Sequence, residues 1–206
     1  MWEDYLYEKH YDRWYQEYIE DIDLANIKWI KLNASELIEF YDENYYDQES
    51  KSYALSTEKN SIIVSPFGLS ITSIYSDQTN SDYTHVLGIV PNKKGKYTIV
   101  AKAKINEHYK YLDEVPECTY IDYIETNSFF RRRGLFKETV KALSKLIDST
   151  KDIILTPETE MGSLCRTTDH LRQILIANNH CGKVKTESEI HDEIEKSFQK
   201  KMKKEQ

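Results

Sequence analysis

Long apolar runs are missing from this sequence of 206 residues. No stretch approaches the roughly 18–20 consecutive apolar residues that a membrane-spanning helix requires. The N-terminal stretch is acidic and aromatic, and it lacks the apolar core of a secretory signal peptide. We therefore expect a cytoplasmic protein that has no membrane partner.

Cysteine is scarce as well. The sequence has three cysteines, Cys118, Cys165 and Cys181, and none of them forms a Cys-x-x-Cys pair. Three cysteines cannot all form disulfides within one chain, and this fits a reducing compartment. His180 lies next to Cys181, but no second pair stands at the spacing typical of zinc ligands. The sequence therefore predicts no metal site.

An excess of positive charge is also lacking. The formal net charge is −7, whereas a general nucleic-acid-binding protein normally carries a basic face. We therefore expect no nucleic-acid partner from the composition, although a local basic site is compatible with this charge. The length suits one α/β domain with a full core and an added arm.

Aromatic residues, in contrast, are concentrated at the N-terminus, where seven of the first eighteen residues are Tyr or Trp. Tyr7, Tyr11, Trp14 and Tyr18 follow the i, i+4, i+7, i+11 spacing of one helical face. We expect residues 1–24 to form an amphipathic aromatic helix that is added to a domain spanning residues 25–206. Its stripe either packs on that domain or forms a docking surface for a homodimer or protein partner.

The rest of the chain predicts an α/β (α+β) fold, with a mixed, mostly antiparallel sheet flanked by helices. Period-two and period-3.6 patterns, capping signals and turn residues place the elements. Strands are expected at 27–31, 61–64, 69–75, 85–90, 97–105, 119–126, 152–156 and 183–185, and helices at 33–41, 136–147, 163–179 and 189–204.

One segment between a strand and a helix suits a bound phosphate. It reads Arg131-Arg132-Arg133-Gly134-Leu135-Phe136, and we call it the signature segment. A helix N-terminus presents unpaired N–H groups and about half a positive charge. Glycine lets the backbone approach phosphate oxygens closely. The same residues would also suit a solvated charged turn that begins an ordinary amphipathic helix.

With its flanks, the region from about Cys118 to Ile147 resembles the acetyl-CoA-binding core of the GNAT superfamily of N-acetyltransferases. That family's signature is Arg or Gln, two free positions, Gly, one free position, then Gly or Ala. Phe136 departs from the last position. The resemblance implies a GNAT-like acyl-CoA transferase fold, acetyl-CoA as cosubstrate and an amine acceptor. It also implies that backbone amides from Arg131 to Phe136 hold the pyrophosphate, and that the thioester runs along the strand end that includes Ile124 and Thr126.

The resemblance also implies where catalysis takes place. Family members carry the group that removes the amine proton on the strand before the signature, and Tyr120 and Asp122 occupy such positions. Strand side chains alternate, so we expect these two to share a face, with Glu125 on the opposite one. A carboxylate with a purely structural role is the alternative for Asp122. The tyrosine that often protonates the leaving thiolate is replaced by Leu175.

Three functions therefore stay open. The first is an acyltransferase that moves an acetyl group from acetyl-CoA to an amine of an unidentified small molecule or protein. The second is a GNAT-like CoA-binding or protein-interaction module without catalysis, which Leu175 favours. The third is a toxin-like enzyme that acetylates aminoacyl-tRNA, which the net charge disfavours.

Overall fold

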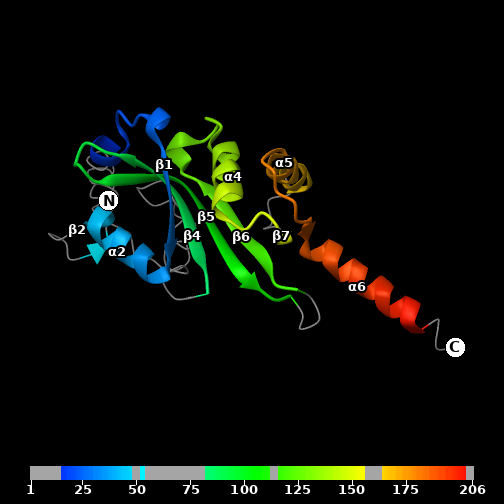
Figure 1. The fold of residues 1–206 in the computed structure, drawn as a ribbon. Helices are drawn as coiled ribbons and strands as arrows, with labels where there is room; N and C mark the ends of the chain where they lie inside the picture. The colour runs from blue at the N-terminus through cyan, green and yellow to red at the C-terminus, as the bar shows by residue number, and fades with distance from the viewer. Residues whose placement is uncertain (1–14, 48–51, 54–81, 112–115, 156–163, 203–206) are drawn as a thin grey trace, which may run out of the picture.

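Six strands form one sheet in the computed structural model, which describes residues 15–47, 52–53, 82–111, 116–155 and 164–202 (Figure 1). Its spatial order is β1-β4-β5-β6-β7-β8. The first four strands pair antiparallel, and β7 and β8 join in parallel. The strands are β1 (Lys28–Asn33), β4 (Thr84–Pro91), β5 (Tyr97–Tyr109), β6 (Cys118–Thr126), β7 (Ile153–Leu155) and β8 (Val184–Thr186).

Four α-helices accompany this sheet in the described part of the chain. They are α2 (Ala34–Tyr45), α4 (Leu135–Leu146), α5 (Leu164–Ala177) and α6 (Glu187–Met202). A separate small pair, β2 (Tyr46–Asp47) and β3 (Ser52–Tyr53), follows α2. The predicted fold class, a mixed and mostly antiparallel sheet flanked by helices, is confirmed.

A capping box begins α2. The side-chain Oδ1 of Asn33 accepts a hydrogen bond from the Glu36 amide at 3.0 Å. The Glu36 carboxylate accepts one from the Asn33 amide at 2.8 Å. Two N–H groups that the helix cannot satisfy internally are thereby paired.

The two faces of the sheet are covered by different helices. Ile153 and Leu155 of β7 pack with α4 and α5 in one apolar cluster, together with Val140 and Leu175. Ile154, between them, packs instead with Ile190 of α6 in a second cluster. This alternation follows from the period of two along a strand. The first cluster anchors α4, and α4 begins at the signature segment.

The predicted N-terminal helix is only partly within the described residues. Tyr7, Tyr11 and Trp14 lie outside them, so the helix over that stretch stays a prediction. Residues 15–19 form one π-helical turn, and the buried Tyr18 packs in the core cluster beside β4 and β5. The division into residues 1–24 and 25–206 also stays a prediction, and the strands predicted at 61–64 and 69–75 lie outside the described residues.

Within the described residues, no helix combines the length and the apolar character needed to cross a membrane. The longest described helix, α6, spans sixteen residues and is rich in charge.

The loop between α5 and β8 makes a close backbone contact that tests this arrangement. A methyl group added at Gly182 would lie 2.0 Å from the carbonyl oxygen of Lys151, just before β7. Backbone cannot move away cheaply, so we expect Gly182→Ala to lower the free energy of unfolding by about 1–3 kcal/mol. Lys183→Ala, at the next and exposed position, should change it by less than about 0.5 kcal/mol. Urea denaturation measures both; equal stabilities would contradict the contact.

Candidate functional site

Asn127 controls the turn that connects β6 to the signature segment. Its side chain is fully buried and donates a hydrogen bond to the Ile99 carbonyl of β5 at 2.8 Å. Its Oδ1 accepts a bond from the Phe129 amide at 3.1 Å, and its own amide donates to Val100 at 3.0 Å. One amide side chain therefore ties the end of β6 to β5 and shapes the short 3-10 turn at Ser128–Phe130.

Gly134 precedes α4 in a left-handed conformation, with φ +80° and ψ 4°. An L-residue would pay about 1–2 kcal/mol for that conformation, so glycine suits the position. No side chain caps the helix N-terminus, and the first helical bond runs from the Glu138 amide to the Gly134 carbonyl at 3.3 Å. The amides of Gly134–Lys137 therefore have no carbonyl partner within the helix. A methyl group on Gly134 would meet no atom within 4 Å, so the space above the turn is open.

The side chains of the signature segment divide into exposed cations and buried apolar groups. Arg131, Arg132 and Arg133 are exposed, and the guanidinium of Arg133 lies 5.8 Å from the Phe130 ring centroid. Leu135 is buried in the core. Phe136 is half-buried, and its ring stacks on that of His170 in α5 at 6.2 Å. Three exposed cations thus immediately precede an uncapped helix N-terminus, which is a favourable setting for an anion.

Ile124 and Thr126 lie at the end of β6 that leads into this turn. They pair with Ala103 and Ala101 of β5, and Ile124 packs against the cluster formed with α4 and α5. Among the described residues, the last pair between β6 and β7 is Ile121 with Leu155. β6 continues beyond this pair to Thr126, and the turn that follows leads to the helix N-terminus.

A β-bulge lies on β6 at Asp122. Lys104 of β5 pairs with Tyr123, whereas the next residue, Ile105, pairs with Ile121, so Asp122 is the extra residue. A bulge shifts the alternation of side chains by one position. Tyr123 therefore lies on the face of its cross-strand partner Lys104.

The bulge corrects one expectation from the sequence. Strict alternation placed Glu125 on the opposite face from Asp122. In the structure Glu125 pairs directly across from Lys102, and cross-strand partners project from the same face. Asp122 reaches Lys104 on that face, so the carboxylates of Glu125 and Asp122 lie on one side of the sheet.

Asp122 forms an ion pair with a buried lysine. Its Oδ2 lies 3.1 Å from Nζ of Lys104, whose side chain is 8% exposed. The Lys104 ammonium also sits 4.3 Å from the centroid of the Tyr83 ring. Burial and then the negative charge of Asp122 raise the pKa of Tyr83, so this phenol stays protonated through neutral pH. A carboxylate, an ammonium group and a phenol therefore meet on one face of β6.

Tyr120 lies two residues earlier on β6. Its buried ring stacks on Tyr109 with centroids 4.5 Å apart, in the cluster that also holds Ile154 and Ile190. Tyr83 packs against the same cluster and contacts the partner of Asp122. The predicted shared face of Tyr120 and Asp122 therefore agrees with their surroundings.

Leu175 proves to be a core residue. It is fully buried in the cluster between α4 and α5, with Val140 and Leu143. A tyrosine at this position would overpack that core, so Leu175→Tyr is expected to destabilise the fold and not to supply a proton donor.

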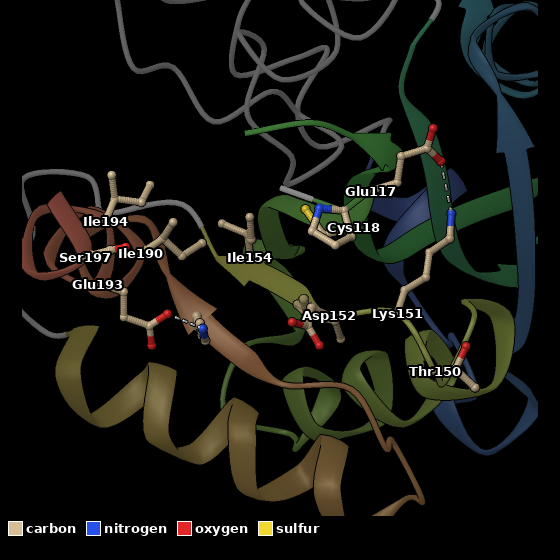
Figure 2. A pocket seen from close by; sticks show the side chains of 13 residues that line it. Glu117, Cys118, Thr150, Lys151, Asp152, Ile154, Ile190, Glu193, Ile194 and Ser197 are labelled. Atoms are coloured by element: carbon tan, nitrogen blue, oxygen red, sulfur yellow. Dashed lines mark hydrogen bonds and ion pairs between the residues drawn. The ribbon is translucent and has the colours of Figure 1, made fainter. Parts of the chain in front are cut away.

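A cavity of about 490 Å³ lies at the other end of β6 (Figure 2). Its lining includes Cys118 and Asp152, at the beginnings of β6 and β7. It also includes Ile154 of β7 and, from α6, Ile190 and Ile194. Charges of both signs occur at its rim, where Lys151 pairs with Glu117 at 3.7 Å and Lys185 with Glu193 at 2.5 Å. The signature segment follows the opposite end of the strand, so the cavity and the helix N-terminus are separate places.

Sequence reasoning missed Asn127, Lys104 and Tyr83. The alternation Ala101-Lys102-Ala103-Lys104 within a strand pattern was the available signal for one face lined by lysine. Nothing in the local sequence indicates that Tyr83 meets Asp122, because these residues are brought together by strand pairing. Across the described residues, no group of three or more His, Cys, Asp or Glu side chains is placed to hold a metal ion.

No protein-family model and no curated protein matches this chain. Among solved structures, one similar chain is an aminoglycoside N-acetyltransferase in complex with a bisubstrate analogue of CoA and monomethyl-acetylneamine. It shares 12% identity at a TM-score of 0.38, and the match covers 73% of this chain and 89% of that chain.

Two further structures are similar to the same degree. A CoA complex of an aminoglycoside N-acetyltransferase shares 10% identity at a TM-score of 0.37, covering 72% of this chain and 89% of the other. An aminoglycoside 6′-N-acetyltransferase from Acinetobacter baumannii shares 10% sequence identity at a TM-score of 0.38. That match covers 73% of this chain and 89% of the other. All three are N-acetyltransferases, the class that the sequence resemblance implies. Because identities and TM-scores are this low, the functional proposal rests on the chain's own residues.

Cys118 allows a direct test of the geometry at the cavity. Burial, with a smaller contribution from the Asp152 charge, raises the pKa of its thiol to about 11. Because the thiolate is the reactive form and only about one thousandth of the Cys118 thiol is ionised at pH 8, its alkylation should be slow. We expect iodoacetamide to alkylate the exposed Cys181 and to spare Cys118 until the protein is unfolded. Peptide mass mapping measures both; equal alkylation rates in the folded protein would contradict the placement.

Proposed function

We propose that this chain is an acetyl-CoA-dependent N-acetyltransferase. The observation that carries the proposal is the N-terminus of α4, where three exposed arginines, a left-handed glycine and an uncapped helix end follow the short turn after β6. Charge-assisted hydrogen bonds to phosphate contribute roughly 1.5–3 kcal/mol each. The amides from Arg131 to Phe136 would bind the pyrophosphate of CoA, and no residue of this site needs a metal ion to do so.

The pantetheine arm is proposed to run along β6 beside Ile124 and Thr126, toward the bulge. This path supports the proposal because β6 continues there beyond its pairing with β7. The thioester would then reach the region of Asp122, where the sheet presents its cluster of ionisable side chains.

Asp122 is proposed to take the proton from the attacking amine, directly or through water. The amine nitrogen then attacks the thioester carbonyl, and the C–S bond breaks as CoA leaves as a thiolate. Tyr120 is proposed to return a proton to the sulfur. The acceptor is an amine of a small molecule or protein; aminoacyl-tRNA acetylation and CoA binding without catalysis are the alternatives.

Acetyl-CoA binding is tested by Gly134→Asp. The substitution adds a side chain and a negative charge where the pyrophosphate would lie, so isothermal titration calorimetry should show heat for the wild type and none for the variant. Gly95→Asp is the matched control, because Gly95 also has positive φ (+71°) and no atom within 4 Å of an added methyl group. Its heat should equal that of the wild type. Absence of heat in the wild type, or equal heats for all three proteins, would sink the proposal.

The role of Asp122 is tested by Asp122→Asn. If it accepts the amine proton, kcat should fall by about 10²–10⁴ while the Kd for acetyl-CoA stays nearly unchanged. Lys104→Met is the control, because it breaks the same ion pair but keeps the carboxylate, so kcat should fall far less than in Asp122→Asn. Release of the CoA thiol during incubation with a panel of amines measures turnover.

An equal fall in kcat for Asp122→Asn and Lys104→Met would show that the ion pair has a structural role. Binding of acetyl-CoA without turnover on any amine would favour the non-catalytic module. Turnover only on aminoacyl-tRNA would favour the toxin-like enzyme.

A further inference from the structure

The apolar row of α6 begins in the core and continues beyond it. Ile190, Ile194, Phe198 and Met202 stand four residues apart along this helix. The first two pack on β6 and β7, whereas the last two are 59% and 64% exposed. The C-terminal half of α6 projects away from the sheet (Figure 1). Its apolar row therefore has no cover among the described residues.

Charge divides the same helix into two halves. Residues 187–195 carry five acids and no Lys or Arg, whereas residues 196–204 carry five lysines and no acid. This order complements the helix macrodipole and stabilises α6 itself. It also surrounds Phe198 and Met202 with positive charge. The projecting half thus presents a basic and apolar surface.

A projecting half-helix of this kind gains little from its own propensity. Isolated helices shorter than about 12–15 residues are marginal in water, and most helical stability in proteins comes from packing of an apolar face. Exposed Phe and Met residues on one row are typical of helices that dock on a partner. The partner should be acidic and apolar.

The N-terminal segment of the same chain has that composition. Residues 1–17 carry five acids against only Lys9 and Arg13, and they hold Tyr7, Tyr11 and Trp14 of the predicted stripe, whereas Tyr18 is buried in the chain's own core. Aromatic side chains are the usual anchors of protein interfaces. Charge and apolar character are therefore both complementary to the projecting half of α6.

The two segments leave the domain at opposite sides. Tyr18 and Ile19 pack near the β4–β5 hairpin, and Glu20 pairs with Lys93 of that hairpin at 2.7 Å. α6 follows β8, at the far edge of the six-stranded sheet from β1. The Tyr18 carbonyl accepts a hydrogen bond from Thr98 of β5, whereas α6 begins after Thr186, which lies level with Ile105 of β5 across three strand spacings. Seven residues along the strand and three spacings across the sheet amount to about 23 Å and about 14 Å. Fourteen residues in the predicted helix would cover only about 21 Å, so as a helix the segment would not reach its own α6.

We propose that the projecting half of α6 docks the N-terminal segment of a second copy of this chain. The same contact made twice gives a closed two-fold dimer, in which each chain supplies one basic helix and one acidic aromatic segment. Lys196 and Lys200 face acids of the partner segment, and Phe198 and Met202 pack on its aromatic stripe. The site for acetyl-CoA plays no part in this contact.

Sedimentation velocity of the full chain at micromolar concentration tests the proposal. The wild type should sediment as a dimer, and Phe198→Glu combined with Met202→Glu should weaken the dimer by ~30-fold or more. Ile176→Glu is the matched control, since Ile176 of α5 is equally exposed at 60% but lies outside the row. Circular dichroism and Tm confirm that each variant is folded. A monomeric wild type, or equal weakening by the control, would overturn the proposal.

A charge exchange identifies the occupant. Lys196→Glu with Lys200→Glu should give monomers, as should Glu8→Lys with Asp12→Lys. All four substitutions together should restore the dimer, because the attraction is re-formed with reversed signs. A dimer that survives the Glu8→Lys and Asp12→Lys changes would show that α6 pairs with another surface, and it would overturn the proposed partner.

Discussion

The candidate site depends on the hydrogen bonds that the buried side chain of Asn127 makes. A buried amide must satisfy its hydrogen bonds within the protein, and this one does so by joining β5 to the turn after β6. These hydrogen bonds fix the start of the turn at the end of β6. Gly134 ends the turn in a left-handed conformation. The helix that follows is held by its apolar cluster, so its free N–H groups have a fixed position relative to the strand.

The bulge at Asp122 lies at the other end of the proposed site, where ionisable side chains meet. It places a carboxylate beside the ammonium group of Lys104, which is almost completely buried. Burying the Lys104 ammonium group is costly, and one ion pair with Asp122, whose side chain is 28% exposed, offsets only part of that cost. The pair lies on a central strand beside a phenol, and we propose that this arrangement serves proton transfer. The proposed phosphate site and the proposed proton-transfer site then lie along one strand.

Much of this fold could be predicted from the sequence. β4, β5, β6 and α4 begin and end within a few residues of the predicted bounds, because their apolar periods are strong and their turns contain Gly or Pro. The bulge could not be predicted, since it depends on how β6 pairs with β5. The meeting of Tyr83 with Asp122 depends on the same long-range pairing. Leu175 was assigned by correspondence with a family position, and its burial follows from packing that the sequence does not encode locally.

Hydrogen–deuterium exchange with and without acetyl-CoA tests the central claim most directly. The amides of Gly134–Lys137 have no helical partner, so a bound pyrophosphate should slow their exchange markedly, while the β4–β5 hairpin should not change. Slower exchange would extend along Ile124–Thr126 if the pantetheine arm follows β6. Protection confined to the cavity between α6 and the beginnings of β6 and β7, or no protection at all, would contradict the account.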